Sequence, residues 1–386
     1  MSRRSLAARA SAAWGRFWFS PSSTETLGLV RIFVSFTLVL KMIGTWGIYR
    51  GLDGLRLQLP HREGMSHGAF RLPVPGFEWL PPLDAADIRL GESLVLGGAV
   101  LLTLGLGTRL VSAGLAVIGV YYLLESQWNY LHHVNVYVWV LVMFALSPMG
   151  DHYSIDAWLK GWWARRKGGV AVVPVRPALH ARMLQIFVSV LYITTTIGKL
   201  TPDWFTGRFM TVLGQQGWLK GPWKDTLLGL MPPPLLGWWT LFAEGLLGFG
   251  LWHPRTRRFT AWCGVSLHLG IDAMMNVTTF SYLMISLYLV FGEAKSKGSR
   301  LSIDPSVGWQ RALAAFVWLF DWTRRFSITA GPAGDGLQVW PAGGGPVRRG
   351  ADALVTVGGL LPITFMLGYW VEELWFALRR LRSNRA

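Results

Sequence analysis

The sequence predicts an all-α polytopic membrane protein, a bundle of about eight transmembrane helices with a small C-terminal α/β domain. Three observations predict this fold class. First, 52% of the 386 residues are hydrophobic and 15% are charged, whereas soluble domains carry about 25% charged residues. Second, apolar segments recur along the chain, and a membrane span needs about 20 mostly apolar residues. Third, lysines and arginines gather in alternate connecting loops, as in multi-pass membrane proteins.

The basic excess of the chain belongs to its membrane loops and does not predict nucleic-acid binding. The net charge is +16, which in a soluble domain would indicate a nucleic-acid footprint. Here the basic residues lie between apolar spans, without basic and aromatic residues interleaved on a soluble surface. The single cysteine, Cys263, excludes a disulfide within the chain and a thiolate metal site. We therefore expect the lipid bilayer as a partner, and neither nucleic acid nor a metal cofactor.

Residues 1–26 are predicted to form a basic N-terminal segment that lies on the membrane. Its predicted helix, 6–19, carries aromatic side chains on one face and arginines on the other. Such a pattern indicates a helix in the plane of the membrane interface. The segment lacks an apolar run followed by a small-residue cleavage site, so no cleaved signal peptide is expected.

Residues 27–292 form the predicted transmembrane domain. Arg31 and Lys41 fall inside its first span. A charge near the bilayer centre costs about 2.5–3.5 kcal/mol on insertion scales, so Lys41 is expected to face the bundle interior or a water-filled cavity. The predicted spans cover residues 27–48, 88–106, 110–124, 134–148, 183–200, 235–252, 259–275 and 278–291.

The loop charges predict a multi-pass protein of the cell (inner) membrane with both termini in the cytoplasm. One set of segments holds the dense Lys/Arg runs: 1–26, 107–109, 150–182, 253–258 and the chain after 291. The other set has nearly balanced charge: 49–87, 125–133, 201–234 and 276–277. Because cytoplasmic loops carry the basic excess, the second set is predicted to be extracytoplasmic.

Residues 300–386 change in character and predict a small cytoplasmic α/β domain. The sequence indicates strands at 301–303 and 337–340, an amphipathic helix at 309–322 and a glycine turn at 343–345. Segment 354–378 is apolar enough for a ninth span, but Pro362 and two adjacent glutamates interrupt it. Two helices of the α/β domain are therefore preferred over a ninth span.

The most informative stretch of the chain surrounds Lys199, at the end of the fifth predicted span. Asp203 and Trp204 follow it, and Pro202 restricts continuation of the helix. A lysine in a low-dielectric pocket loses its proton more readily, and the neutral amine is a competent general base. The alternative is a lysine that extends to the lipid headgroups beside an interfacial tryptophan.

A second polar segment, 125–133, precedes the fourth predicted span on the same side. It contains Trp128, Asn129, His132 and His133. Adjacent residues on a helix point about 100° apart, so only one histidine would face a common centre. A histidine can shuttle protons or hydrogen-bond a substrate oxygen. The alternative is an interfacial polar loop without chemistry.

The seventh predicted span carries a polar stripe. His268, Asp272 and Asn276 recur every four residues and therefore share one helix face. Polar residues inside a span usually face the bundle interior and have a partner. Asp272 is therefore a candidate to orient the His268 imidazole towards a substrate. The alternative is that these residues only hold helices together.

Three short motifs, each present once, lie in this part of the chain. They are Lys-Leu-x-x-Asp-Trp-x-x-Gly at 199–207, Trp128-Asn129 with His133, and His268 with the later Phe280. Over about residues 15–292 the chain resembles the horizontally transferred transmembrane domain, which is shared with vitamin K-dependent γ-carboxylase.

The resemblance implies roles for several residues. In the carboxylase, a lysine of this motif is the base linked to deprotonation of vitamin K hydroquinone, a role that would fall on Lys199. By the same likeness His133 belongs to the active site, and a vitamin K-like quinol is the implied cofactor. The candidate substrate-binding residues are Trp128, Asn129, Asp203, Trp204, His268 and Asp272.

The chain also departs from the carboxylase. Residues 194–196 are threonines where the family usually has small Ala or Gly residues. The large β-rich domain that follows the membrane part of the carboxylase and binds the substrate propeptide has no counterpart here. Carboxylation of a protein glutamate is therefore not implied.

The tail resembles a second family. Arg349-Gly350-Ala-Asp352-Ala-Leu354 is similar to the C-terminal half of DCC thiol-oxidoreductases, which are thioredoxin-like domains with an Asp-Gly-x-Cys-x-x-Cys motif. The matching run begins at Asp304 and places Val307 and Gln310 at the two cysteine positions. The likeness therefore implies a remnant or docking module without dithiol chemistry.

Two functions remain open from the sequence. One is a quinol-linked enzyme with an extracytoplasmic active site, either a carboxylase/epoxidase-like lyase or a quinol-dependent oxidoreductase. The other is a non-enzymatic membrane protein that handles a lipid or small molecule, or serves as a partner subunit. Lys199→Arg separates them, because arginine keeps the positive charge but stays protonated and cannot act as a base.

Overall fold

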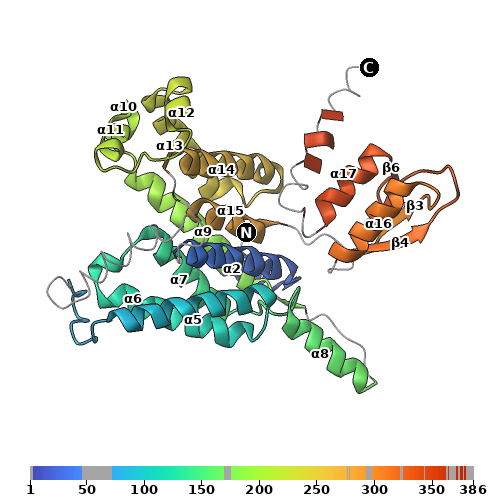
Figure 1. The fold of residues 1–386 in the computed structure, drawn as a ribbon, viewed down its shortest axis with the longest axis horizontal. Coiled ribbons are helices and arrows are strands. Elements are labelled where there is room, and N and C mark those ends of the chain that lie inside the picture. The colour runs from blue at the N-terminus through green and yellow to red at the C-terminus, as the bar shows by residue number, and fades with distance from the viewer. Residues whose placement is uncertain are drawn as a thin grey trace. The chain divides into compact units, whose positions relative to one another are not determined.

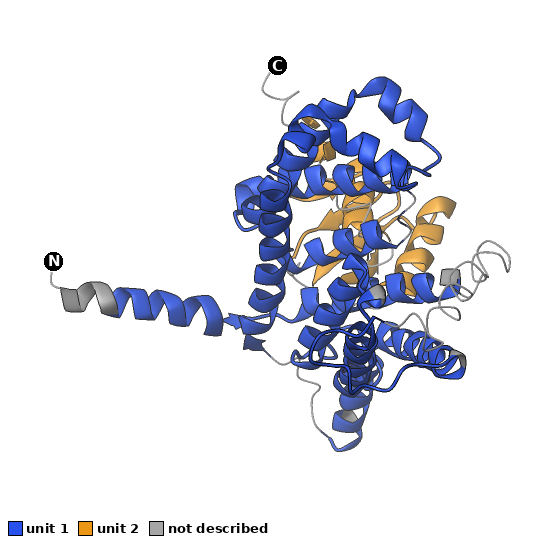
Figure 2. Cartoon of the chain, turned by 90° about the vertical axis from the view of Figure 1, so that its left-hand side faces the viewer, with its two compact units in different colours: residues 1–292 blue, residues 293–386 orange. Residues whose placement is uncertain are grey.

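A computed structural model of the chain divides into two compact units, residues 1–292 and 293–386 (Figure 2). The side chains of residues 3–7, 44, 45, 85, 128 and 165 are outside the description. The structure describes residues 3–45, 72–168, 175–275, 277, 279–292, 298–321, 325–342, 344–361, 364, 371, 372, 374–376, 378 and 379.

The first unit is built from helices (Figure 1). Two short strands, β1 (Pro21–Ser22) and β2 (Arg176–Pro177), pair antiparallel. Two 3-10 turns, η1 (Gln127–Asn129) and η2 (Tyr288–Phe291), complete the described elements. The helices are α1 (Arg3–Phe19), α2 (Glu25–Thr45), α5 (Ala85–Leu104), α6 (Thr108–Glu125), α7 (His132–Ala145), α8 (Ile155–Arg166), α9 (Leu179–Gly198), α10 (Pro202–Thr206), α11 (Arg208–Gln215), α12 (Lys224–Leu230), α13 (Pro233–Gly250), α14 (Pro254–Met275) and α15 (Phe280–Leu287).

Each of the eight segments predicted as a membrane span is helical in the described part of the chain. Three helices are both long and apolar enough to cross a membrane: Glu25–Ile43, Thr108–Glu125 and Leu179–Gly198. The fourth and eighth predicted spans, 134–148 and 278–291, correspond to shorter apolar helices. The structure therefore supports a helical membrane protein, and the number of spans stays a prediction.

Short helices occupy loops where the sequence analysis expected none. Proline explains two of the helix starts. Pro202 is the first residue of α10 and Pro233 the first of α13, and proline is favoured there because its missing N–H needs no partner. Pro202 therefore ends the long helix α9 and begins a new one, which bends the chain directly after Lys199.

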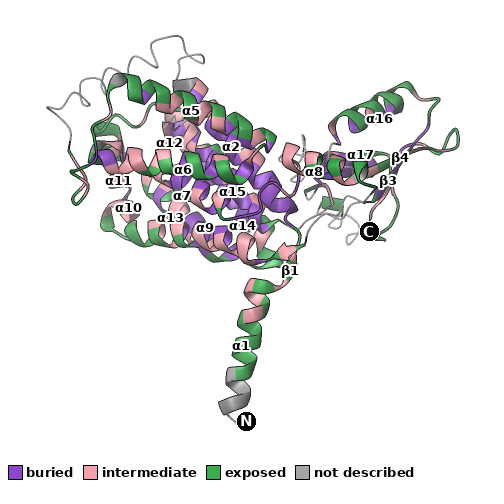
Figure 3. Ribbon diagram, turned by 90° about the horizontal axis from the view of Figure 1, so that it is seen from below, coloured by how far each residue is buried: buried purple, intermediate pink, exposed green. Residues whose placement is uncertain are grey.

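The helices of the first unit pack in a continuous series. Helix α2 packs on α5 and α15, α6 packs on α7, and α13 packs on both α9 and α14. Buried residues gather where these helices meet, whereas α1 is largely exposed where its side chains are described (Figure 3).

The fully buried Arg31 donates to the backbone carbonyls of Met149, Leu102, Thr103, His152 and Tyr153. This arginine therefore ties α2 to the end of α5 and to the turn after α7.

The second unit is a four-stranded sheet with helices. The strands lie in the order β4-β3-β5-β6: β3 and β4 run parallel, and β5 runs antiparallel to both β3 and β6. The elements are β3 (Ser299–Ile303), α16 (Gly308–Phe320), β4 (Phe326–Ala330), β5 (Gln338–Trp340), β6 (Arg348–Arg349) and α17 (Ala351–Leu360). The predicted strands and amphipathic helix are present, although Trp322 and Gly343 lie outside the described residues.

The segment considered as a ninth span begins inside this domain. Ala353, Val357 and Leu361 pack in one buried cluster with Leu301 and Val339 of the sheet. The first half of segment 354–378 therefore contributes to the core of the α/β unit. Pro362 and Glu373 lie outside the described residues.

Candidate functional site

Lys199 forms an ion pair that links two long helices. It caps the C-terminus of α9, and its Nζ lies 2.9 Å from Oε1 and 2.8 Å from Oε2 of Glu244, in the middle of α13. The lysine side chain is 22% exposed and the glutamate side chain 9%. Both oxygens of the carboxylate therefore face one ammonium in a site that is largely removed from solvent. Thr195, one of the three threonines that depart from the family pattern, donates its hydroxyl to the Tyr192 carbonyl at 3.1 Å.

The Trp204 ring lies next to the Lys199 ammonium of this ion pair. Its ring centroid lies 5.3 Å from Lys199 Nζ and its ring stacks on Phe209 at 4.0 Å, an arrangement that stabilises a cation over an aromatic face. A side chain at Gly237 would collide with the Trp204 carbonyl, so this glycine lets α13 approach α10 closely. Asp203 instead lies 3.8 Å from Arg208, and its side chain is 50% exposed. The structure thus brings Trp204, and not Asp203, to Lys199.

A buried chain of polar side chains lies beside the ion pair. The Tyr192 hydroxyl is 2.7 Å from His268 Nε2 and 2.6 Å from the Tyr288 hydroxyl. All three residues are buried, and they come from α9, α14 and the turn after α15. His268 Nδ1 is buried and has no hydrogen-bond partner within the described part of the chain. The cluster therefore presents one nitrogen that a ligand or a water molecule could satisfy.

Asp272 does not orient the His268 imidazole. The His268 partner is Tyr192, whereas Asp272 Oδ2 lies 3.4 Å from the Tyr282 hydroxyl. Helical spacing places the two residues on one face, but the packing of α9 decides which side chain the imidazole meets. Asn276, the third member of the stripe, lies outside the described residues.

His133 belongs to a second polar pair. Its Nε2 lies 3.0 Å from Nζ of Lys41, the lysine expected inside the bundle. One turn further along α7, the Tyr137 hydroxyl donates to Thr37 Oγ1 at 2.9 Å. A lysine ammonium only donates, so with Lys41 charged the His133 Nε2 accepts this bond. Among the described residues no direct contact joins His133 to Lys199.

The remaining two candidates lie before α7. Asn129 donates from Nδ2 to Oε2 of Glu125 at 2.9 Å and to the Tyr122 carbonyl at 2.8 Å. These bonds hold the 3-10 turn against the end of α6. Both use the Asn129 side-chain N–H groups, which a substrate would otherwise contact. The Trp128 backbone is part of this turn, and its side chain lies outside the described residues.

The start of α15 packs against the buried polar chain. The Phe280 ring lies edge-on to His268, with centroids 5.7 Å apart. Within the described ranges no group of three or more His, Cys, Asp or Glu side chains is placed to hold a metal ion.

Glu244 is the residue that sequence reasoning passed over. It lies inside the sixth predicted span, 235–252. A carboxylate inside an apolar span is itself a signal, because such a group is costly in a bilayer and normally has a partner. Its partner lies 45 residues away in the sequence, and no local spacing rule could pair the two.

Comparison with known proteins agrees with the expected family. No curated protein and no solved structure matches the chain. The family model described as the HTTM domain matches residues 19–295, which is most of the chain and includes both polar pairs. On this match, the chain belongs to the HTTM-domain family, a group of membrane proteins.

Proposed function

We propose that this HTTM-domain protein is a membrane enzyme in which Lys199 and Glu244 act as one acid–base pair on a quinol or similar lipid-phase substrate. The observation that carries the proposal is the ion pair itself, with both Glu244 oxygens within 2.9 Å of Lys199 Nζ. Catalytic groups commonly occur as such coupled, partly buried titratable pairs.

Glu244 explains how Lys199 could act as a base although an ion-paired lysine is protonated. A lysine in an ion pair carries its proton and cannot accept another. If that proton moves along the existing hydrogen bond to Glu244, the site holds a neutral amine beside a carboxylic acid. The amine then accepts the proton of a quinol hydroxyl, leaving a quinolate next to an ammonium. Glu244 therefore serves as the temporary proton holder, and charge is conserved at each step.

The surroundings support a flat, weakly polar substrate. Trp204 and Phe209 provide a stacked aromatic wall next to Lys199, and aromatic surfaces suit quinone rings. The unpartnered His268 Nδ1 offers a polar contact on the neighbouring helix. In this proposal Trp204 and His268 keep their substrate-binding roles, and Glu244 replaces His133 as the nearest functional partner of Lys199.

The test is turnover of a reduced vitamin K-type quinol by the purified full chain in nanodiscs, with products followed by mass spectrometry. Lys199→Ala and Lys199→Arg are both expected to abolish turnover, because neither offers an accessible neutral amine. Glu244→Gln is expected to lower it about 100-fold or more, the usual contribution of one acid–base group. Lys220→Ala, at an exposed lysine of the predicted loop that follows Lys199, serves as the matched control.

The rival function predicts the opposite result for one variant. A lipid or small-molecule handler without chemistry needs only the positive charge of Lys199, so Lys199→Arg would behave like the unmodified protein. Solvent extraction of the purified protein provides an independent measurement. A co-purifying quinone supports the proposal. Absence of both a quinone and quinol turnover would contradict it.

For the second unit we infer a thioredoxin-like remnant that cannot perform dithiol chemistry. Its order of elements, β3-α16-β4 followed by β5-β6-α17, supports this inference, and Val307 directly precedes α16. Introducing Val307→Cys together with Gln310→Cys is expected to allow a disulfide, detected as the loss of two hydrogen atoms by mass. Failure to oxidise would contradict the likeness.

A further inference from the structure

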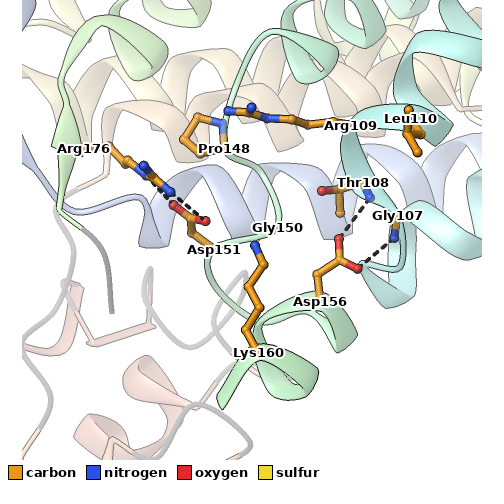
Figure 4. A pocket seen from close by; sticks show the side chains of 10 residues that line it. All are labelled: Gly107, Thr108, Arg109, Leu110, Pro148, Gly150, Asp151, Asp156, Lys160 and Arg176. Carbon is orange, nitrogen blue, oxygen red and sulfur yellow. Dashed lines mark hydrogen bonds and ion pairs between the residues drawn. The ribbon is translucent and has the colours of Figure 1, made fainter. Parts of the chain in front are cut away.

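A cavity of about 340 Å³ lies in the first unit where α6 and α8 begin (Figure 4). Its charged lining residues are Arg109, Asp151, Asp156, Lys160 and Arg176. The loop charges predict that this face is cytoplasmic. The cavity is therefore separate from the Lys199 segment, which is predicted to lie on the opposite side of the membrane.

Both acidic residues of the cavity already have partners. Asp151 Oδ2 accepts a hydrogen bond from Arg176 Nε at 2.8 Å. Asp156 accepts from the backbone N–H groups of Gly107 at 2.9 Å and Thr108 at 3.1 Å, at the N-terminus of α6. The Arg176 charge and the amides of α6 are thus occupied by protein carboxylates. Neither group is available to bind a ligand.

The two other cations of the lining remain. Arg109 and Lys160 are exposed, and within the described part of the chain neither forms an ion pair or a side-chain hydrogen bond. Lys160 extends from α8 towards Gly150, between the two aspartates, and Arg109 extends towards Pro148 (Figure 4). The lining carries three cations and two carboxylates, so the formal net charge of the cavity is positive.

The frame of the cavity is fixed by buried contacts. The turn that carries Gly150 and Asp151 is held by Arg31, which donates to the carbonyls of Met149 and Tyr153. A Cβ at Gly150 would lie 2.6 Å from Thr108 Oγ1 and 3.0 Å from Asp156 Oδ2. Glycine is therefore required for the turn to approach α6 this closely.

The neighbouring surface suits a membrane interface. Trp158 and Trp163 of α8 are 60% and 54% exposed, and Arg166 lies over the Trp162 ring at 4.1 Å. Tryptophan is enriched at the level of lipid headgroups, where basic residues also meet anionic lipids. A positively charged cavity beside such a helix is in reach of lipid phosphate groups.

We propose that this cavity binds a phosphate group through Arg109 and Lys160. A phosphate offers several acceptor oxygens to a guanidinium and an ammonium at once. The group could be carried by an anionic lipid headgroup or be free phosphate. The proposal does not depend on the function assigned to Lys199.

The test measures the apparent Kd of the full chain in detergent by native mass spectrometry. The probes are dioctanoyl phosphatidylglycerol, dioctanoyl phosphatidylcholine and inorganic phosphate. Combining Arg109→Gln with Lys160→Gln is expected to weaken phosphatidylglycerol binding about 25-fold, about fivefold for each cation. Both side chains lack partners within the described residues, so the variant is expected to fold.

Lys167→Gln is the matched control, since Lys167 follows α8 on the same face and does not line the cavity. Its affinity for phosphatidylglycerol is expected to stay unchanged. Competition by inorganic phosphate would identify free phosphate as the ligand, whereas binding without such competition would identify the lipid. An unchanged affinity in the double variant, or an equal loss in Lys167→Gln, would overturn the proposal.

Discussion

Glu244 in the first unit and Asp304 in the second are both buried carboxylates, and the protein holds them in different ways. Glu244 faces a cation, Lys199, at hydrogen-bond distance. Asp304 faces neutral donors: the N–H and hydroxyl of Ser306, at 2.9 and 2.5 Å, and the N–H of Gly334 at 2.7 Å.

The difference concerns where a proton can go. In the proposed mechanism, one proton moves between Lys199 and Glu244, two titratable groups at hydrogen-bond distance, and the pair exchanges protons with a substrate. The amide and hydroxyl donors around Asp304 do not titrate near neutral pH. These bonds lower the pKa of Asp304, chiefly through the Gly334 N–H and then through Ser306. The first arrangement suits acid–base chemistry and the second fixes a loop.

The largest expected effect comes from breaking the ion pair. Glu244→Gln leaves the Lys199 ammonium without its counter-charge in a site where the lysine is only 22% exposed. We expect a loss of about 2–4 kcal/mol in the free energy of unfolding, reduced from the fully buried case by that exposure. Thermal or steric-trap unfolding in detergent measures it.

A double variant provides the control for this prediction. Combining Glu244→Gln with Lys199→Met removes the orphaned charge, so the double variant should be more stable than Glu244→Gln alone. If the two substitutions simply added, the pair would not be coupled, and the contrast with Asp304 would lose its basis.

The next effect concerns the polar chain beside the pair. Tyr192→Phe removes the hydroxyl that meets both His268 Nε2 and Tyr288, and leaves those two buried groups without it. We expect a loss of about 1–3 kcal/mol in stability. Tyr130→Phe, at an exposed tyrosine, is the matched control and should change little. Equal stability of the two variants would mean that the hydrogen bonds of Tyr192 with His268 and Tyr288 do not stabilise the fold.

The smallest expected effect is a pH-dependent one in the second unit. Since the folded pKa of Asp304 is lowered, its stabilisation is present above the ordinary aspartate pKa of about 3.9 and disappears as pH falls through the folded pKa. Asp304→Asn should therefore weaken hydrogen-exchange protection of β3 and β5 at neutral pH, and differ less from the parent in acid.

Asp335→Asn is the control for this measurement, because Asp335 is exposed in the loop just after Gly334. A constant difference between Asp304→Asn and the parent at every pH would contradict a contribution from the ionised carboxylate.

Hydrophobic patterning was enough to predict most helices. Each predicted span is helical because an apolar run of that length has few alternatives in a bilayer. The helices after Lys199 were missed, since short segments in a polar loop carry no strong periodicity. Strand β4, five residues long, and strand β6, two residues long, were missed as well. The expected strands and helix of the second unit followed from local pattern alone.

In the candidate site too, local motifs could be predicted from the sequence, whereas contacts between helices could not. The motif around Lys199 and Trp204 is local in sequence, so it could be found without a structure. The side-chain pairs between helices could not be found in this way. Lys199 with Glu244, Lys41 with His133 and Tyr192 with His268 each join different helices, and helix periodicity fixes only which residues share a face.

By itself, therefore, the sequence determined a basic, helical membrane protein and its family, and it singled out Lys199 as a candidate base. Only the tertiary structure decided that Lys199 meets a carboxylate from α13 and that His133 meets Lys41 instead. The physical reason is that side-chain spacing governs contacts within one helix, whereas contacts between helices depend on close approaches such as that of Gly237 to α10. Such approaches form only when the whole bundle packs.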